Sequence, residues 1–106
     1  LFVYDLEQWR LLEAKLNSLP MTRKGARDFN RFFFGGAAEG ECDKQGRVLL
    51  PANLREFAGL DKNAVIVGVG NRAEIWDTER WNAYNEENAE DVGELAEQLA
   101  DLDLGI

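Results

Sequence analysis

The amino-acid sequence predicts an α+β fold built from two pseudo-repeats, the first of them incomplete, with helices flanking the strands. The first observation behind this prediction is a repeat, because residues 1–9 align with residues 73–81 at an offset of 72. The second is a series of hairpin and β-branched strand signals over residues 40–76. The third is helical spacing of apolar residues over residues 22–34 and again near the C-terminus.

Each copy of the repeat predicts a strand that runs directly into a helix. Asp5 and Asp77 are predicted helix N-caps, because an aspartate side chain can accept hydrogen bonds from the unpaired N–H groups of a first helical turn. The aromatic residues around the two caps have the spacing of a hydrophobic staple: Tyr4 with Trp9, and Trp76 with Trp81. The second copy has a long lead-in and the first has none, so we expect about half of the first repeat to be missing from this sequence.

The lead-in of the second copy predicts a hairpin, a short helix and two strands. Residues 40–48 are expected to form the hairpin, because Gly46 can adopt the positive φ that a tight turn requires. Pro51 is expected to begin a helix over Ala52–Ala58, which Gly59 closes. A β-branched strand over residues 64–69 and a return strand over residues 72–76 follow, joined by a tight turn at Gly70 and Asn71.

Residues 22–34 predict an amphipathic helix. At ~100° per residue, one face is apolar: Ala26, Phe29, Phe32 and Phe33. The opposite face is basic: Arg23, Lys24, Arg27 and Arg31. We expect the aromatic residues to lie in a core or an interface. The basic face is expected to be solvated or to form ion pairs with another subunit, and a track for DNA is the alternative.

The C-terminal stretch predicts an acidic amphipathic helix. Eight of residues 86–103 are acidic and none is basic. Its apolar residues follow helical spacing: Val92, Leu95, Leu99 and Leu102. Docking on its own chain is the default expectation for such a leucine stripe. Binding a helix of a partner, or masking a DNA-binding face by competing with phosphate, are the alternatives.

Composition and charge exclude several classes of function. The single cysteine, Cys42, excludes an internal disulfide framework, and the lack of histidine excludes His-based acid–base chemistry within one chain. No apolar run approaches the ~20 residues of a membrane span. The net charge is −8, but residues 1–62 sum to +1 (ten basic, nine acidic) and residues 63–106 to −9 (two basic, eleven acidic). The acidity is thus concentrated in the tail, which leaves DNA binding open.

Three acidic residues alternate along the first strand of the predicted hairpin: Glu39, Glu41 and Asp43. Side chains at this spacing share one face of a strand, where they could bind a hard cation or perform acid–base chemistry. Solvated carboxylates, or partners for arginines of a neighbouring subunit, are the preferred interpretation, so we predict no metal site and no catalytic residue. Cys42 would point to the other face and is expected to be a small buried apolar residue.

Four segments of the chain carry a family resemblance. They are RFFFGGAAE (residues 31–39), DKQGRVLLP (43–51), LREFAGL (54–60) and GVGNRAEIW (68–76). In this order they resemble the MraZ family of AbrB-like transition regulators, whose DxxxR motif is present in the second segment. The motif would mean little alone, but the resemblance is specific in this context and extends over residues 1 to about 88.

The resemblance implies an AbrB-like swapped-hairpin β-barrel built from two intertwined pseudo-repeats, with DxxxR hairpins at its surface. It also implies that chains assemble into ring-shaped homo-oligomers. Such rings would bind direct DNA repeats upstream of the division and cell wall gene cluster and regulate its transcription. This sequence departs from the pattern because the first DxxxR hairpin is absent, so we expect closure of the barrel to need a second chain or the fold to be incomplete.

The repeat and the resemblance together divide the chain into four parts. Residues 1–20 would be the end of the first AbrB-like repeat, a strand plus a helix, and residues 21–36 a linker helix. Residues 37–88 would form the second repeat, and residues 89–106 the acidic amphipathic tail.

The resemblance assigns the DNA contact to the hairpin. Arg47 is carried over as the contact and Asp43 as the residue that orients it, whereas the residues alone also allow a simple surface ion pair across the hairpin. Lys44, at the tip, is expected to contact phosphate. Arg55 is a further DNA-binding candidate, for which a solvated position or a subunit contact is the alternative.

We therefore expect a sequence-specific DNA-binding regulator in the cytoplasm, associated with the nucleoid, whose partners are promoter DNA and other copies of itself. We expect no enzymatic activity, cofactor, membrane or small-molecule substrate. Gly68 and Gly70 lie between two strands and do not open a helix, so they are not a nucleotide-binding loop. The alternative is a structural or protein-interaction module without DNA binding, which the acidic balance and the apolar tail stripe favour.

Overall fold

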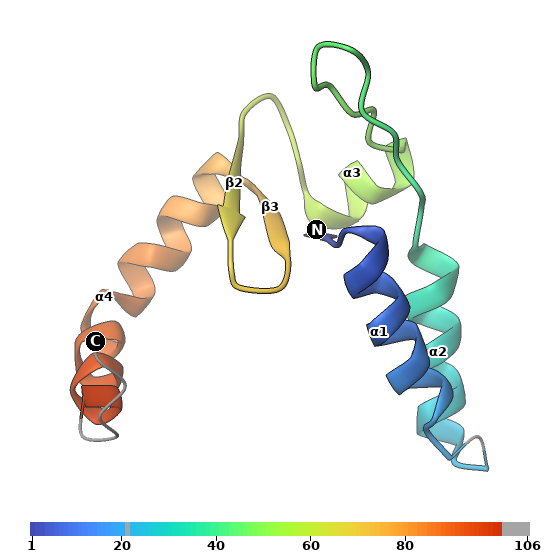
Figure 1. Ribbon diagram of the computed structural model, residues 1–106. Helices are drawn as coiled ribbons and strands as arrows, with labels where there is room; N and C mark the ends of the chain where they lie inside the picture. Colours follow the sequence, from blue (N-terminus) through green and yellow to red (C-terminus); the bar gives the residue numbers. More distant parts are fainter. Residues whose placement is uncertain (21, 101–106) are drawn as a thin grey trace.

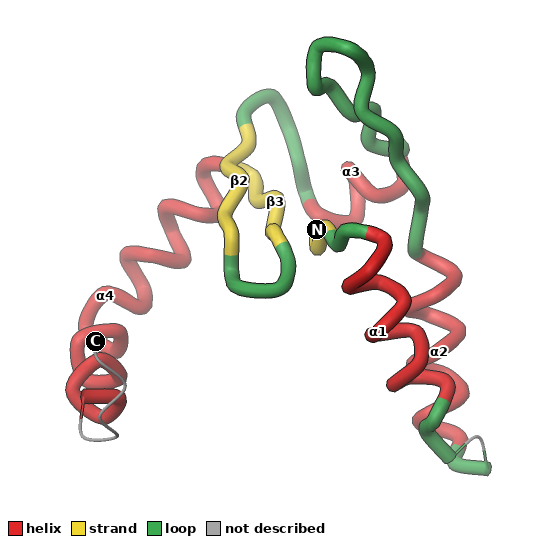
Figure 2. Tube along the Cα trace, in the orientation of Figure 1, coloured by secondary structure: helices red, strands yellow, loops and turns green. Residues whose placement is uncertain are grey.

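The computed structural model describes residues 1–20 and 22–100 of the chain and combines helices with a small sheet (Figure 1). In chain order its elements are β1 (Phe2–Val3), α1 (Leu6–Asn17), α2 (Lys24–Gly36), α3 (Ala52–Ala58), β2 (Ala64–Gly68), β3 (Ala73–Asp77) and α4 (Thr78–Ala100). The mixed α and β content is as predicted. A long loop separates α2 from α3 (Figure 2).

The sheet brings the two copies of the repeat side by side. Its strands are antiparallel in the order β1-β3-β2, with Phe2 opposite Glu74 and Val65 opposite Trp76. The predicted turn between the last two strands is present, because Gly70 has a φ of 91° and the Val69 N–H donates to the carbonyl oxygen of Arg72 at 2.9 Å. The strand that precedes the first cap therefore pairs directly with the strand that precedes the second.

Both predicted helix caps are confirmed. The Asp5 carboxylate accepts the N–H of Gln8 at 2.7 Å, and that of Asp77 accepts the N–H of Arg80 at 3.3 Å. The aromatic pairs around the caps are also in contact, with ring centroids 6.3 Å apart for Tyr4 and Trp9 and 5.5 Å apart for Trp76 and Trp81. Each staple fixes the direction in which the strand enters its helix.

The helices α1 and α2 pack against each other through aromatic rings. Trp9 stacks on Phe33 with centroids 5.6 Å apart and meets Phe34 edge-on at 5.8 Å. The predicted helix over residues 22–34 is confirmed, but it begins and ends two residues later. Phe29 and Phe32 are exposed, so they do not lie in a core, because the face that meets α1 is rotated toward Phe34. An interface position, the other expectation for these two residues, stays a prediction.

The prediction of a β-hairpin over residues 40–48 is wrong in its strands and right in its turn. No strand forms between residues 37 and 51, all of which the structure describes. Gly46 has the expected positive φ of 78°, and its N–H donates to the carbonyl oxygen of Asp43 at 3.1 Å. Cys42 is exposed and not buried as expected. A strand needs backbone hydrogen bonds to a neighbouring strand along its length. The two arms of this loop are joined by backbone hydrogen bonds at the turn, from Asp43 to Arg47 and from Gly46 to Asp43.

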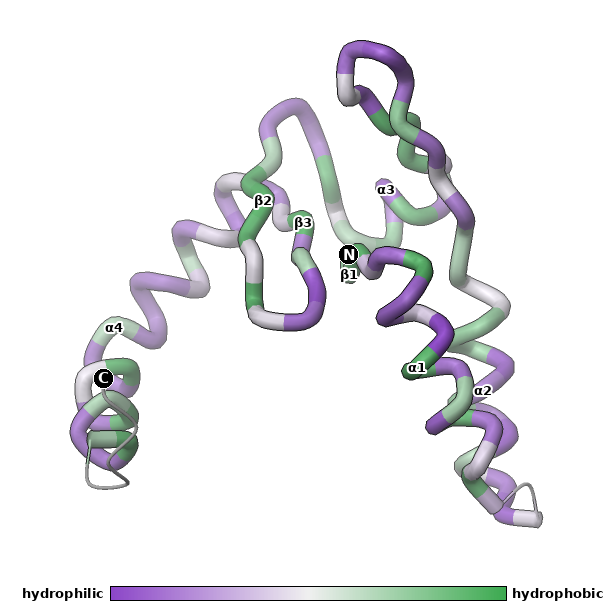
Figure 3. The backbone as a smooth tube through the Cα atoms, in the orientation of Figure 1, coloured by the Kyte–Doolittle hydropathy of each residue, from purple (hydrophilic) through white to green (hydrophobic). Residues whose placement is uncertain are grey.

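The chain is more open than a compact domain of its length. Its radius of gyration is 17.1 Å, whereas a compact chain of this size has one of about 13 Å. Within residues 1–20 and 22–100 no apolar side chain is fully buried, and Ile66 in β2 and Leu49 are 72% and 87% exposed. Apolar segments are spread over all the elements and do not gather at one centre (Figure 3).

The acidic tail does not dock on the described part of its own chain. It is the second half of α4, which is continuous from the sheet to Ala100 and extends away from it (Figure 1). Val92, Leu95 and Leu99 are exposed, so the default expectation of docking is wrong for these three residues. Leu102, the fourth residue of the predicted stripe, lies outside the described residues.

Candidate nucleic-acid interface

The turn that follows Asp43 is organised by the carboxylate of that residue. One carboxylate oxygen accepts the backbone N–H groups of Gln45 at 2.9 Å and of Arg47 at 2.8 Å. The other accepts the Nε–H of Arg47, also at 2.8 Å. The backbone N–H of Asp43 donates to the carbonyl oxygen of Arg47 at 2.8 Å, which closes the turn. With the DxxxR spacing, the aspartate side chain can therefore accept the backbone N–H groups of the turn and hold the arginine side chain at the same time.

Arg47 is held in place and still presented to solvent. Its Nε–H is bound by Asp43, its Nη2 donates to the side-chain oxygen of Gln45, and its side chain is 75% exposed. A guanidinium carries five N–H donors in a rigid plane, so these two bonds leave three donors for another molecule. Planar donors of this kind suit phosphate oxygens and the edge of guanine.

The hydrogen bonds of the turn also act on the ionisation of Asp43. The backbone N–H of Arg47 lowers the pKa of the Asp43 carboxyl below its usual value, with further lowering from the Arg47 side chain and the N–H of Gln45. Each of these donors stabilises the charged form of the acid. The carboxylate, and with it the orientation of Arg47, is therefore maintained throughout the neutral pH range.

The structure brings three of the four predicted site residues into one turn. Asp43, Lys44 and Arg47 lie together at the loop between α2 and α3, and Lys44 is exposed. Arg55 lies apart from them, in the last turn of α3, where it is also exposed. Gln45 was not among the predicted site residues, although its position between the two ends of the motif could have indicated its contact with Arg47.

A second polar cluster, which the sequence analysis did not identify, holds the sheet together. Arg72 and Glu74 form an ion pair at 3.1 Å, and the indole N–H of Trp76 donates to Glu74 at 3.1 Å. The guanidinium of Arg72 also lies 4.2 Å from the ring centroid of Phe2 in β1. Glu74 and Trp76 lie in β3 and Arg72 directly precedes it, so the spacing of two could have predicted that the three side chains share one face. Their contacts within the sheet indicate a structural role.

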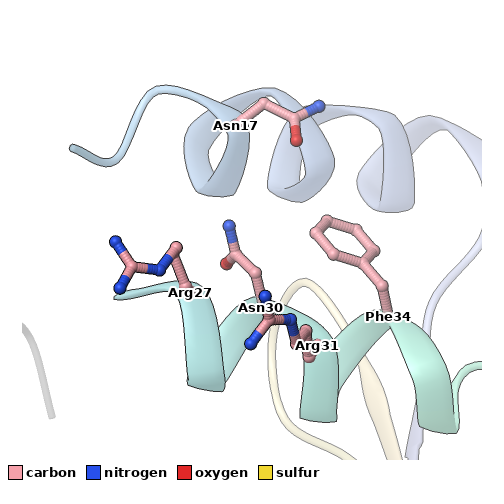
Figure 4. Close-up of a pocket in the computed structure, with 5 residues that line it drawn as sticks. All are labelled: Asn17, Arg27, Asn30, Arg31 and Phe34. Carbon is pink, nitrogen blue, oxygen red and sulfur yellow. The ribbon is translucent and has the colours of Figure 1, made fainter. Parts of the chain in front are cut away.

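The basic face of α2 divides between solvent and a groove. A groove of about 290 Å³ runs between α1 and α2 (Figure 4). It is lined by Asn17, Arg27, Asn30, Arg31 and Phe34. Asn30 is the most buried of these, at 7% exposure, and its side-chain N–H donates to the carbonyl oxygen of Leu16 at 3.4 Å. Arg27 and Arg31 therefore share one side of the helix with Phe34, which was not part of the predicted apolar face.

The described residues contain neither a metal-binding cluster nor a membrane-spanning helix. Across residues 1–20 and 22–100, no cluster of three or more Cys, Asp or Glu side chains could hold a metal ion. No helix in this part of the chain is long and apolar enough to cross a membrane.

The sequence is similar to a known family over most of its length. Residues 33–103 match the family described as "MraZ protein, putative antitoxin-like". A protein named transcriptional regulator MraZ from Heliobacterium modesticaldum is 59% identical over 104 residues, which cover 98% of this chain and 73% of the relative. Proteins of the same name from Pelotomaculum thermopropionicum and Syntrophomonas wolfei are 56% and 54% identical, over 100% and 96% of this chain and 73% and 71% of their own lengths.

Both kinds of similarity include the turn at residues 43–47 and the segments on either side of it. The family match covers more than half of the chain, and each of these relatives is aligned over more than two thirds of its own length. The chain therefore belongs to the MraZ family.

Proposed function

We propose that this chain is a DNA-binding transcriptional regulator that reads DNA through the turn at residues 43–47. The observation that carries the proposal is the arginine at the exposed end of this turn, which is oriented by Asp43 and has three N–H donors left for a ligand. The name of the relatives, transcriptional regulator MraZ, supports the same role. Lys44 is proposed to contact phosphate, and Arg55 to extend the basic surface toward α3.

We further propose that the chain binds as a ring-shaped homo-oligomer to direct repeats upstream of the division and cell wall gene cluster. One turn offers few cationic contacts, too few for tight binding at physiological salt. Several copies at regular spacing engage successive DNA repeats with a high effective concentration. The exposed apolar side chains of β2, α3 and the loop before it support self-assembly, because monomeric proteins rarely leave large apolar patches uncovered.

The proposed architecture is the AbrB-like swapped-hairpin barrel. Residues 1–20 would belong to the first repeat, 21–36 to a linker helix, 37–88 to the second repeat and 89–106 to the tail. Strands of a second chain would pair with the arms of the loop around Asp43. Such pairing would supply the hydrogen-bond partners that the arms lack here. A cytoplasmic location in association with the nucleoid follows from the proposed DNA ligand.

A fluorescence anisotropy titration tests DNA binding. Labelled DNA that carries spaced direct repeats is compared with a scrambled duplex at several salt concentrations, with the wild-type chain and with Arg47→Ala. We expect sequence-dependent binding by the wild type, and weaker binding with a smaller salt slope for the variant. Equal affinity of the wild type for both duplexes would contradict the proposal.

A structural or protein-interaction module without DNA binding is the second candidate, and the exposed apolar residues favour it. The two functions are separated by the assembly state of Arg47→Ala. Loss of DNA binding with the assembly intact supports the regulator. If the variant loses only its assembly, the structural role is supported instead.

A further inference from the structure

Two features of the chain remain outside the proposed DNA-binding function. One is the groove between α1 and α2, and the other is the exposed apolar stripe on the second half of α4. No segment within residues 1–20 and 22–100 occupies the groove, and no surface within the same residues covers the stripe. Their chemistry is complementary.

The groove suits an acidic segment that also carries apolar side chains. Figure 4 shows Arg27, Asn30, Arg31 and Phe34 projecting from α2 and Asn17 from α1. Two guanidinium groups and the exposed amide of Asn17 provide donors for carboxylates, whereas the Asn30 amide is buried and already donates to Leu16. The ring of Phe34 provides an apolar surface beside them. Arg31 is only weakly engaged in the chain itself, by Asp28 at 3.7 Å, with its side chain 77% exposed.

The tail, together with the turn of α4 that precedes it, has the matching pattern. Glu87 and Asp91 are four residues apart in α4, so they lie one helical turn from each other on the same side. At ~100° per residue they border the stripe of Val92, Leu95 and Leu99. Arg27 and Arg31 are also four residues apart, in α2. Two carboxylates therefore have the same spacing as two guanidinium groups, each pair beside an apolar contact surface.

We propose that the α4 tail of one chain docks in the α1–α2 groove of a second copy of this chain. Glu87 and Asp91 then face Arg27 and Arg31, and the apolar stripe covers Phe34. This inference rests on the proposed self-assembly and adds the surfaces that produce it. Because the groove and the tail are different surfaces, the contact is heterologous, and every chain both offers a tail and receives one.

Two other occupants of the groove are less favourable. The tail of the same chain is held away, because α4 is one continuous helix whose start is fixed by the Asp77 cap and by the contact of Trp76 with Trp81. In Figure 1, α4 and the α1–α2 pair diverge from the sheet. A pairing of tail with tail would bring together segments in which all charged residues are acidic.

The test uses charge reversal in the whole chain, with assembly measured by sedimentation velocity at fixed salt and protein concentration. The tail variant is E87K/D91K, and its matched control is E90K/E97K, which makes the same charge change on the face of α4 opposite the stripe. The groove variant is R27E/R31E, and its control is R23E/K24E, at the start of α2 outside the groove. Circular dichroism checks that all four remain helical.

We expect the tail and groove variants to associate at least ~10-fold more weakly than the wild type, and both controls to associate as the wild type does. An equimolar mixture of the tail and groove variants should regain assembly, because each supplies the charge that the other needs. If the wild type assembles and all four variants do so equally, the docking is wrong and the self-assembly stands. If the mixture regains nothing, the docking is also wrong. A wild type that stays monomeric overturns both.

Discussion

Replacing Asp43 by alanine tests the DNA-binding proposal sharply, because the two roles open to this residue predict effects of opposite sign. As a solvated acid near DNA, Asp43 would repel phosphate, and its removal would strengthen binding to any sequence. As the residue that orients Arg47, it would favour specific binding. Its three hydrogen bonds to the backbone and side chain of the turn support the second role. We therefore expect Asp43→Ala to weaken binding to the specific sequence.

The magnitude follows from the mobility that Arg47 would regain. Fixing one long, mobile side chain on binding lowers the affinity for the ligand about 2- to 13-fold. In the free chain the Asp43 carboxylate already holds the Arg47 side chain in place, so this loss of affinity is avoided. Losing the carboxylate should weaken specific binding by that factor for each engaged turn. Two engaged turns give about 5- to 150-fold. Binding to a scrambled duplex should stay equal or become tighter, because one negative charge has been removed.

The assay is anisotropy with specific and scrambled duplexes at matched salt. Glu41→Ala is the control, because it removes the same charge from an exposed residue two positions away. We expect the control to bind both duplexes as tightly as the wild type or more tightly. If Asp43→Ala behaves like Glu41→Ala on the specific duplex, Asp43 does not orient Arg47 for DNA.

Three further predictions concern the turn and the framework. The pKa of Asp43 is lowered, so the interaction with Arg47 should persist as the pH falls through 3.8 and be lost only below it; a carbon NMR titration midpoint at or above 3.8 would contradict this. Trp9→Ala removes three ring contacts, with Tyr4, Phe33 and Phe34, and should lower the free energy of unfolding by about 1.5–4.5 kcal/mol in urea titrations at fixed protein concentration. Gly59→Ala should lower it by about 1–2 kcal/mol, because Gly59 has a φ of 64°, and an added Cβ would lie 2.2 Å from Cζ of Arg80. A Gly59→Ala, Arg80→Ala double variant that unfolds like the Arg80→Ala variant alone would show that the backbone conformation is not strained.

Local signals in the sequence predicted the parts of the fold that depend on neighbouring residues. The caps at Asp5 and Asp77 and the turn at Gly46 were correct, because each needs only a few residues of chain around it. The same reason explains why the ion pair of Asp43 and Arg47 was correct, because the two residues are four positions apart.

Features that depend on distant partners were not predicted correctly. The sequence of residues 40–48 predicts a turn with a strand on each side, but it does not show whether another strand lies beside them to complete their hydrogen bonds. The orientation of α2 was missed for a similar reason, because helical spacing identifies the aromatic side chains without indicating which of them meets Trp9. Phe34 lies in that contact, and Phe32 lies near Phe57 of α3. The groove at Arg27 and Arg31 follows from this rotation.

The open shape of the chain has a consequence for the quantity of protein that a cell must hold. A chain whose described residues include no buried apolar side chain derives much of its stability from whatever covers its surfaces. When the cover is another copy, folding becomes a reaction of higher order, and the midpoint of thermal unfolding rises with total protein concentration. Dilution then removes assembled and folded molecules together. Under the proposed self-assembly, the concentration of the chain in the cell would set a threshold below which little functional protein persists.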